Sequence, residues 1–240
     1  MKHTQGLLEN GNLALPLFHG TSSIFIESIR QHGLGGVNPI QQYDVVPFMQ
    51  RLFERCQRRL AGSREWEIKA NIIGAIAQQE VKGFNFRHGA TYLTPARYVA
   101  ARYACSNRLG SEAISEAAEC LLLLPDEDRT ELRRHPVAQL FDARHEPIVI
   151  RVESVPVSYL RTEYGGDPRE QLDEMVELAR LAPQLSDLHR SEVLWQQENF
   201  ELIEPIEQAK LVLFRAREIC RHPPNYRFEV LGDYAAEGDA

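Results

Sequence analysis

Apolar and polar positions along the chain follow two periods, and together they predict a protein of mixed helix and sheet. An apolar run over 13–18 is typical of a strand, and it leads into a polar turn at 19–21. A cap at Ser22 or Ser23 then predicts a short helix, which Gly33 ends because glycine adopts the conformation of a helix C-terminus at little cost. The chain therefore opens as strand, polar turn and helix.

The segment from about 43 to 82 has helical spacing. Apolar residues four positions apart form two stripes, which are Phe48, Leu52, Cys56 and Leu60, and then Ile68, Ile72 and Ile76. A stripe of this period lies along one face of a helix, so two amphipathic helices are expected. We interpret them as a helical insert at about 40–84 within a single domain that spans residues 1–240.

A second junction of strand and helix follows this insert. Tyr92 and Leu93 close a short strand, and Thr94-Pro95 is typical of a helix start, so a helix is expected from 95 to about 105. The other predicted elements are surface helices at 111–124 and 126–134, a strand at 147–152, a helix from Asp167 through Ala179, strands at 192–195, 200–206, 210–215 and 226–231, and a frayed tail from Ala235. These elements predict an α+β fold.

Composition narrows the class of protein. Of the 240 residues 43% are hydrophobic, which suits a folded domain, yet the longest strictly apolar stretch, Leu121 to Leu124, is far too short to span a membrane. The four cysteines form no Cys-x-x-Cys pair and no secretion signal opens the chain, so we expect a cytoplasmic protein with reduced thiols and no membrane partner. The histidines lack metal-ligand spacing, so no metal site is expected.

Two short motifs carry candidate chemistry. In the first, His19-Gly20-Thr21, glycine can let a ligand approach the backbone while histidine and threonine offer side-chain hydrogen bonds; the alternative is an ordinary turn at a strand end. In the second, Tyr103 follows Tyr92 by eleven positions, about two turns along the helix that Tyr92 introduces. Both rings can then face one cleft, or they can be packing residues.

Together the two motifs resemble the ADP-ribosyltransferase fold of the diphtheria-toxin and poly(ADP-ribose) polymerase type. Members of that family have a His-Tyr-Glu triad on a split β-sheet core with helical insertions. His19-Gly20-Thr21 matches the strand end that supplies the histidine, and Tyr92 matches the triad tyrosine. Tyr103 matches a second tyrosine, which stacks on nicotinamide. For the glutamate, Glu192 before an apolar run fits best, and Glu201 is the alternative.

The resemblance implies an enzyme that uses NAD as co-substrate. His19 and Thr21 would belong to the NAD site, with His19 on the adenosine-side ribose and the Gly20 backbone on the nicotinamide amide. Tyr92 and Tyr103 would sandwich the nicotinamide ring. Glu192 would accept a hydrogen bond from the 2′-hydroxyl of the nicotinamide ribose and stabilise positive charge on that sugar in the transition state.

The acceptor of ADP-ribose stays open between protein, RNA and DNA. A net charge of −7 argues against bulk binding of nucleic acid, but four arginines share one helix face, either as a phosphate-binding path or as a solvated surface; they are Arg51, Arg55, Arg58 and Arg59. The chain resembles bacterial toxin or phage-defence transferases that add one ADP-ribose, which suggests an antitoxin or inhibitory partner. Two rival functions are an NAD-dependent RNA 2′-phosphotransferase and a non-catalytic module that binds an NAD-like ligand or a partner.

Overall fold

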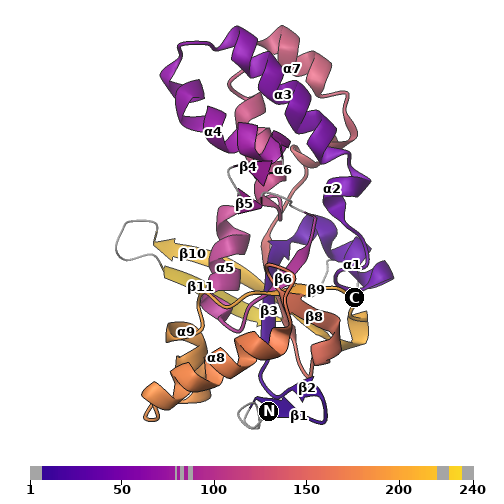
Figure 1. The fold of residues 1–240 in the computed structure, drawn as a ribbon. Helices are drawn as coiled ribbons and strands as arrows, with labels where there is room; N and C mark the ends of the chain where they lie inside the picture. The colour runs from indigo at the N-terminus through magenta and orange to yellow at the C-terminus, as the bar shows by residue number, and fades with distance from the viewer. Residues whose placement is uncertain (1–6, 79, 82–83, 86–88, 221–226, 234–240) are drawn as a thin grey trace. The chain divides into compact units, whose positions relative to one another are not determined.

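A computed structural model describes residues 7–78, 80–81, 84–85, 89–220 and 227–233. The described chain combines helices with antiparallel sheets, so the prediction of a mixed α and β protein is confirmed (Figure 1). The chain divides into two compact units. Unit 1 comprises Met1–Val37, Ala90–Ser106 and Glu146–Ala240, and unit 2 comprises Asn38–Gly89 and Asn107–His145. The predicted insert at about 40–84 falls in unit 2, and the predicted tail from Ala235 lies outside the described residues.

Unit 1 is built on antiparallel strands. They are β1 (Leu8–Glu9), β2 (Asn12–Leu13), β3 (Leu17–Ser22), β6 (Thr91–Leu93), β7 (Pro147–Val152), β8 (Leu160–Thr162), β9 (Phe200–Leu202), β10 (Leu211–Cys220) and β11 (Arg227–Asp233). One sheet has the order β11-β10-β7-β3 and another the order β6-β9-β8. Phe18 on β3 and Thr94, just after β6, exchange both backbone hydrogen bonds, at 2.8 and 2.9 Å, so a single bridge connects these two sheets.

Four α-helices accompany these strands in the described part of unit 1. They are α1 (Ile26–His32), α5 (Arg97–Ser106), α8 (Pro168–Leu181) and α9 (Asp187–Val193), with short 3-10 turns η2 (Ser23–Phe25), η4 (Val157–Tyr159) and η5 (Gln208–Lys210). Helix α8 begins as the sequence predicts, because the Asp167 side chain accepts a hydrogen bond from the Arg169 amide and Pro168 takes the first helical position.

Helix α5 packs on the four-stranded sheet through small residues. Ala100, Ala101 and Ala104 are buried on this face, and they let the helix approach β3 closely. A Cβ atom at Gly20 would lie 2.1 Å from the carbonyl oxygen of Ala100, so no larger residue fits on the strand at this point. We expected Gly20 to make room for a ligand, but on its side-chain face the room is taken by α5.

The core of unit 1 lies on the opposite side of these strands. It joins the larger sheet, the smaller sheet and α8, and its most enclosed side chains include Leu17, Leu93, Ile148, Ile150, Leu172, Trp195 and Phe200. Each such side chain contributes about 1.5–3 kcal/mol when it is fully buried. This continuous packing holds β3 and β6 in one framework.

Unit 2 is mainly helical. Its elements are α2 (Pro39–Gln42), α3 (Val45–Arg59), α4 (Arg64–Gln78), β4 (Glu80–Val81), β5 (Phe84–Asn85), α6 (Glu112–Leu121), α7 (Asp126–Leu132) and the 3-10 turn η3 (Pro136–Leu140). The predicted stripe of α3 is buried at Phe48, Leu52 and Cys56. Helix α6 was predicted at the surface, and this is wrong, since Ile114 and Cys120 on it are fully buried against α3 and α4.

Two further predictions fail for identifiable reasons. The predicted strand at 192–195 is the end of α9, which Ser186 starts by accepting a hydrogen bond from the amide of His189. The stripe predicted for α4 is correct only at its end: Ile76 is buried, but Ile68 and Ile72 are 67% and 42% exposed, and Trp66 and Ile73 are buried instead. In both cases a short apolar run fits more than one arrangement.

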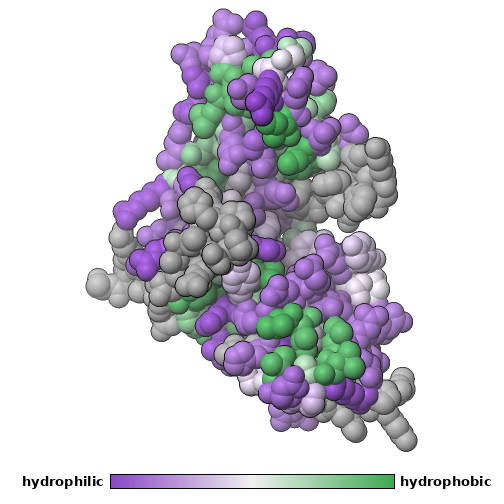
Figure 2. All heavy atoms as spheres, turned by 90° about the vertical axis from the view of Figure 1, so that its left-hand side faces the viewer, coloured by the Kyte–Doolittle hydropathy of each residue, from purple (hydrophilic) through white to green (hydrophobic). Residues whose placement is uncertain are grey.

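The surface of unit 1 includes an apolar patch. Figure 2 shows it in the lower half of the view, where α8 and α9 lie, and exposed apolar side chains on these helices include Leu178, Leu181 and Val193. None of the helices in the described ranges has both the length and the apolar character that a membrane crossing requires.

Candidate functional site

His19 on β3 and Tyr92 on β6 meet in unit 1. The Nδ1 atom of His19 lies 2.9 Å from the backbone carbonyl oxygen of Tyr92, 73 positions away in the sequence. The Phe18–Thr94 bridge between the same two segments fixes this approach. The two motifs that the sequence singles out are therefore adjacent in space.

The hydrogen bond of His19 defines its chemistry. A carbonyl oxygen can only accept, so Nδ1 donates the proton in this bond. Burial lowers the pKa of His19 below its ordinary value, and the bond to Tyr92 offsets this only in part. The imidazole is then neutral at pH 7, and its Nε2 atom is a hydrogen-bond acceptor, suited to a hydroxyl group.

The neighbours of His19 differ in what they offer a ligand. Along a strand, the backbone N–H and C=O of successive residues point to opposite edges. Phe18 directs its N–H and C=O toward Thr94, so Gly20, two residues later, directs its own N–H and C=O to that same edge of β3, away from β7. Among the described residues no hydrogen bond to Gly20 is found on this edge. Thr21, in contrast, is only 2% exposed. The backbone of Gly20 thus offers a donor and an acceptor, and the Thr21 side chain is enclosed.

Tyr92 belongs to a row of polar side chains across the smaller sheet. In the antiparallel register Tyr92 is opposite Glu201, and Glu201 is opposite Arg161. Directly opposite residues project on one face of a sheet, so the three side chains share a face. Arg161 holds the carboxylate at both oxygens, with Nε 2.7 Å from Oε2 and an η nitrogen 2.5 Å from Oε1.

The charges in this row act on Tyr92. Burial raises the pKa of the Tyr92 phenol, and the negative charges of Glu201 and Glu163 raise it further against the opposing charge of Arg161. The phenol therefore stays neutral at physiological pH and keeps its proton for donation. Each carboxylate oxygen of Glu201 retains a lone pair beyond its bond to Arg161, so it can accept a further hydrogen bond.

Glu192 lies elsewhere in unit 1. It is in α9, and its carboxylate accepts from the backbone amide of Tyr98 at 3.1 and 3.3 Å. Tyr98 is in the first turn of α5, where backbone amides have no partner within the helix. Glu192 thus stabilises the start of α5 by a hydrogen bond and by its favourable charge at the positive end of the helix dipole. The structure places Glu201, not Glu192, opposite Tyr92.

Tyr103 is on α5 and is 38% exposed, whereas the alanines of this helix that face β3 are buried. It lies between Ala100 and Ala104, whose backbone atoms come closest to the Cβ position of Gly20. The helix therefore places Tyr103 within one turn of Gly20. The structure thus brings His19 and Tyr92 together and sets Glu201 opposite Tyr92, and it places Tyr103 on the helix that packs against Gly20.

The local sequence around Arg161 does not mark it as a site residue. Arg161 lies between Leu160 and Thr162 on a three-residue strand, and a basic residue in such a place is common at ordinary exposed strand positions. Only the register of β8 against β9 brings it to Glu201, and register between distant strands cannot be taken from local spacing.

The four arginines of α3 separate into two kinds in unit 2. Arg55 bonds to Asp128 and, at 2.9 Å, to Glu131 of α7, and Arg59 bonds to Asp128 at 2.8 Å and to Glu127 at 2.9 Å. Burial alone would raise the pKa of Asp128, but the hydrogen bonds and charges of Arg55 and Arg59 outweigh it and lower that pKa. These two arginines tie α3 to α7. They are therefore not open phosphate ligands.

Comparisons with known proteins add no relative. No protein-family model, no curated protein and no solved structure matches this chain. The geometry of the site in unit 1 is therefore the basis for assigning a function to this chain.

Proposed function

We propose that this chain is an NAD-dependent mono-ADP-ribosyltransferase with His19, Tyr92 and Glu201 as its triad. The observation that carries the proposal is the alignment of these three residues: Glu201 is directly opposite Tyr92 in the sheet, and the carbonyl of Tyr92 accepts the hydrogen bond of His19. Glu201 takes the role that the sequence favoured for Glu192, because Glu192 is engaged at the start of α5.

The arrangement of strands supports the same proposal. The resemblance implies a split sheet with histidine on one strand, tyrosine on a second and glutamate on a third. In unit 1 these residues lie on β3, β6 and β9, and β6 is the strand that meets both of the others. This topology fits an ADP-ribosyltransferase-like core into which the elements of unit 2 are inserted.

Each residue has a role that its hydrogen-bonding capacity suits. The neutral Nε2 of His19 accepts from a ribose hydroxyl, and the free N–H and C=O of Gly20 pair with the carboxamide of nicotinamide, at a net gain of about 1 kcal/mol per bond. Tyr92 and Tyr103 stack on the nicotinamide ring, and Arg161 orients the carboxylate of Glu201.

The reaction breaks the bond between nicotinamide and ribose C1′ and forms a bond from C1′ to a nucleophile of the acceptor. Nicotinamide leaves with the bonding electron pair, and the nucleophile loses a proton. Positive charge develops on the ribose before the new bond is complete. Glu201 stabilises this charge by accepting from the 2′-hydroxyl, an interaction that strengthens in the transition state and therefore accelerates the reaction. We further propose a toxin or defence role, with an inhibitory partner.

The test is release of nicotinamide from NAD by the full chain, with and without RNA, DNA and cell lysate, combined with transfer of label from the adenylate half of NAD. We expect release together with transfer. Tyr92→Ala should weaken NAD use by about tenfold, because it removes one aromatic stacking surface. Tyr164→Ala is the matched control, since Tyr164 is an exposed tyrosine outside this row, and it should leave activity unchanged.

Two outcomes would contradict the proposal in favour of its rivals. Binding of NAD without release would identify a non-catalytic module. Release that requires 2′-phosphorylated RNA, with loss of that phosphate, would identify an RNA 2′-phosphotransferase.

A further inference from the structure

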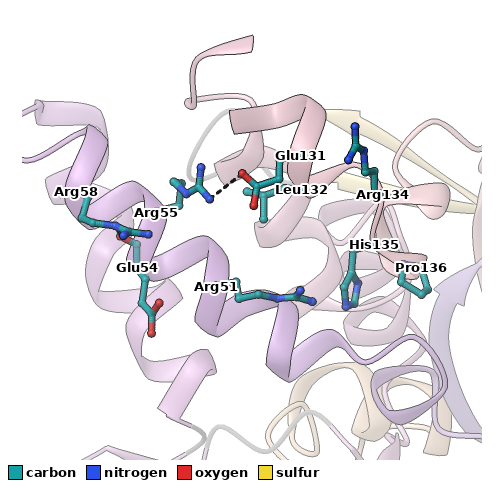
Figure 3. A pocket seen from close by; sticks show the side chains of 9 residues that line it. All are labelled: Arg51, Glu54, Arg55, Arg58, Glu131, Leu132, Arg134, His135 and Pro136. Carbon is teal, nitrogen blue, oxygen red and sulfur yellow. Dashed lines mark hydrogen bonds and ion pairs between the residues drawn. The ribbon is translucent and has the colours of Figure 1, made fainter. Parts of the chain in front are cut away.

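Unit 2 contains a cavity of about 260 Å³ between α3 and the segment from α7 to η3. Nine residues line it: Arg51, Glu54, Arg55, Arg58, Glu131, Leu132, Arg134, His135 and Pro136. In Figure 3 the side chains of Arg51, Arg55 and Arg58 extend from α3 toward the segment that carries Glu131 and His135. All of the lining belongs to unit 2, so the cavity is defined within one compact body.

The lining has an excess of positive charge. Glu131 is neutralised by Arg55, at 2.9 Å. Among the described residues no carboxylate lies within ion-pair distance of Arg51, Arg58 or Arg134. Glu54 is the remaining acidic residue of the lining. The lining thus holds three guanidinium groups that have no ion pair among the described residues, against the single further carboxylate of Glu54.

His135 adds a neutral donor to this wall. Burial, followed by the charge of Arg51, lowers its pKa, with Asp44 opposing, so the imidazole is neutral at pH 7. Its Nδ1 atom accepts from the amide of Val137 at the start of η3, which leaves the proton on Nε2. The ring also packs against Phe48, with ring centroids 5.1 Å apart, so its position is fixed by the core of unit 2.

The spacing of the free arginines suits an extended anion. Arg51 and Arg58 are seven residues apart on α3, which is about 10 Å along the helix axis. That separation exceeds the width of one phosphate, and guanidinium groups match phosphate oxygens in geometry as well as charge. The cavity is smaller than the roughly 300–1,000 Å³ of typical small-molecule sites, so it can enclose one unit of a longer chain rather than a large ligand.

We propose that this cavity binds the sugar-phosphate backbone of a single-stranded nucleic acid through Arg51, Arg58 and Arg134. Unit 2 has 13 basic and 13 acidic residues and thus no net charge that would attract a polyanion to its whole surface. A polyanion would instead be attracted by the positive charge at the cavity. The binding is a separate property of unit 2 and does not require the site in unit 1 to cleave NAD.

The test measures binding of short fluorescent RNA and DNA oligonucleotides to the full chain, without NAD, over a range of salt concentrations. Arg51→Ala/Arg58→Ala should weaken binding at least about tenfold at low salt and flatten the logarithmic salt dependence by roughly 1.4, since each phosphate neutralised on a single strand contributes about 0.7. Arg134→Ala should act in the same direction. Among the described residues, Arg51 and Arg58 donate side-chain hydrogen bonds to backbone carbonyls of their own helix and to no other group, so Arg51→Ala/Arg58→Ala should keep the wild-type melting temperature.

The control is Arg64→Ala/Arg144→Ala, which removes the same charge from exposed positions of unit 2 outside the cavity. This control should bind within about twofold of wild type. An equal loss in the control, or absence of oligonucleotide binding at low salt, would overturn the proposal. So would equal competition by polyglutamate, which would indicate an acidic peptide, or by inorganic phosphate at the same affinity, which would indicate a site for a single ion.

Discussion

The two units distribute similar residue types in opposite ways. Unit 2 is formally neutral, so the entire net charge of −7 is in unit 1, yet three arginines that make no ion pair within the described part of the chain line the cavity of unit 2. In unit 1 the acid beside Tyr92 is held by Arg161 at both oxygens. In unit 2 the acids of α7 take up Arg55 and Arg59 and leave Arg51 and Arg58. An ion pair therefore has a different meaning in each unit: in unit 2 it removes Arg55 and Arg59 from ligand binding, whereas in unit 1 it orients the Glu201 carboxylate, whose remaining lone pairs can still accept.

The sharpest test of this comparison in unit 1 is a pair of glutamates. Glu201→Gln should reduce nicotinamide release by roughly 10²–10⁴, the scale for a positioned catalytic group, because a neutral amide cannot stabilise the developing charge. Glu192→Gln should leave kcat within about a factor of three, since its amide oxygen can still accept from Tyr98. Steady-state kinetics of both variants against NAD checks this. The reverse ranking would return the triad to Glu192.

A matched pair of glycines compares packing in the two units. Gly20→Ala should cost about 3 kcal/mol of unfolding free energy, because the new methyl group meets the backbone of α5, which cannot move alone. At Gly74 in α4 the nearest atom is Cε2 of Phe53, 3.1 Å away, and this ring is only half-buried. Gly74→Ala should therefore stay within about 1 kcal/mol of wild type, helped by the higher helix propensity of alanine. Urea unfolding at pH 7 measures both.

If Gly20→Ala is as mild as Gly74→Ala, the close packing of α5 on β3 is incorrect. The placement of the Tyr103 helix against Gly20 would then lose its support, because it depends on the same contact.

Local patterns in the sequence predicted several elements near the site but not their partners, and the polar turn predicted at 19–21 is wrong, because these residues lie within β3. The strand β7, helix α5 and helix α8 lie where a β-branched run, a Thr-Pro start and an Asp-Pro start predict them. The strand predicted at 192–195 failed because a run of three apolar residues after Glu192 is also compatible with a helix end, where Trp195 is buried and its indole N–H donates to the carbonyl of Met175.

The choice between Glu192 and Glu201 depends on the register of β6 against β9, which sets Glu201 opposite Tyr92. In strands of three residues the register is determined by tertiary packing, so the local sequence does not reveal it. The prediction that the arginines share one helix of the insert is confirmed by α3. Their ion-pair partners, however, include Asp128 and Glu131 of α7, which lie more than 70 positions away from Arg55 in the sequence. Local spacing therefore located the candidate residues, and long-range contacts decided which of them are open to a ligand.

The ion pairs of α7 give a prediction for unit 2. Asp128→Asn should lower the stability of the chain at pH 7 more than Glu201→Gln does, because Asp128 is 2% exposed and holds two arginines, whereas Arg161 is about half exposed. The folded state lowers the pKa of Asp128, so its contribution is present above the ordinary value of 3.8 and is lost as the pH falls through the lower folded value. Unfolding by urea at pH 7 and pH 3 should show the difference between variant and wild type shrinking in acid.

The smallest expected effect concerns His19 and His135, one histidine in each unit. Burial lowers the pKa of both below 6.5 in the folded chain, so the unfolded chain binds more protons just below that pH. Stability should then fall as the pH decreases from 6.5 toward the folded values and should be independent of these groups above it. His19→Gln, which keeps a donor for the Tyr92 carbonyl, and His135→Gln should each flatten the decline, and the double variant should flatten it further. Denaturant unfolding between pH 5 and 8 measures these slopes, and an unchanged slope in His19→Gln would show that folding does not lower the pKa of His19.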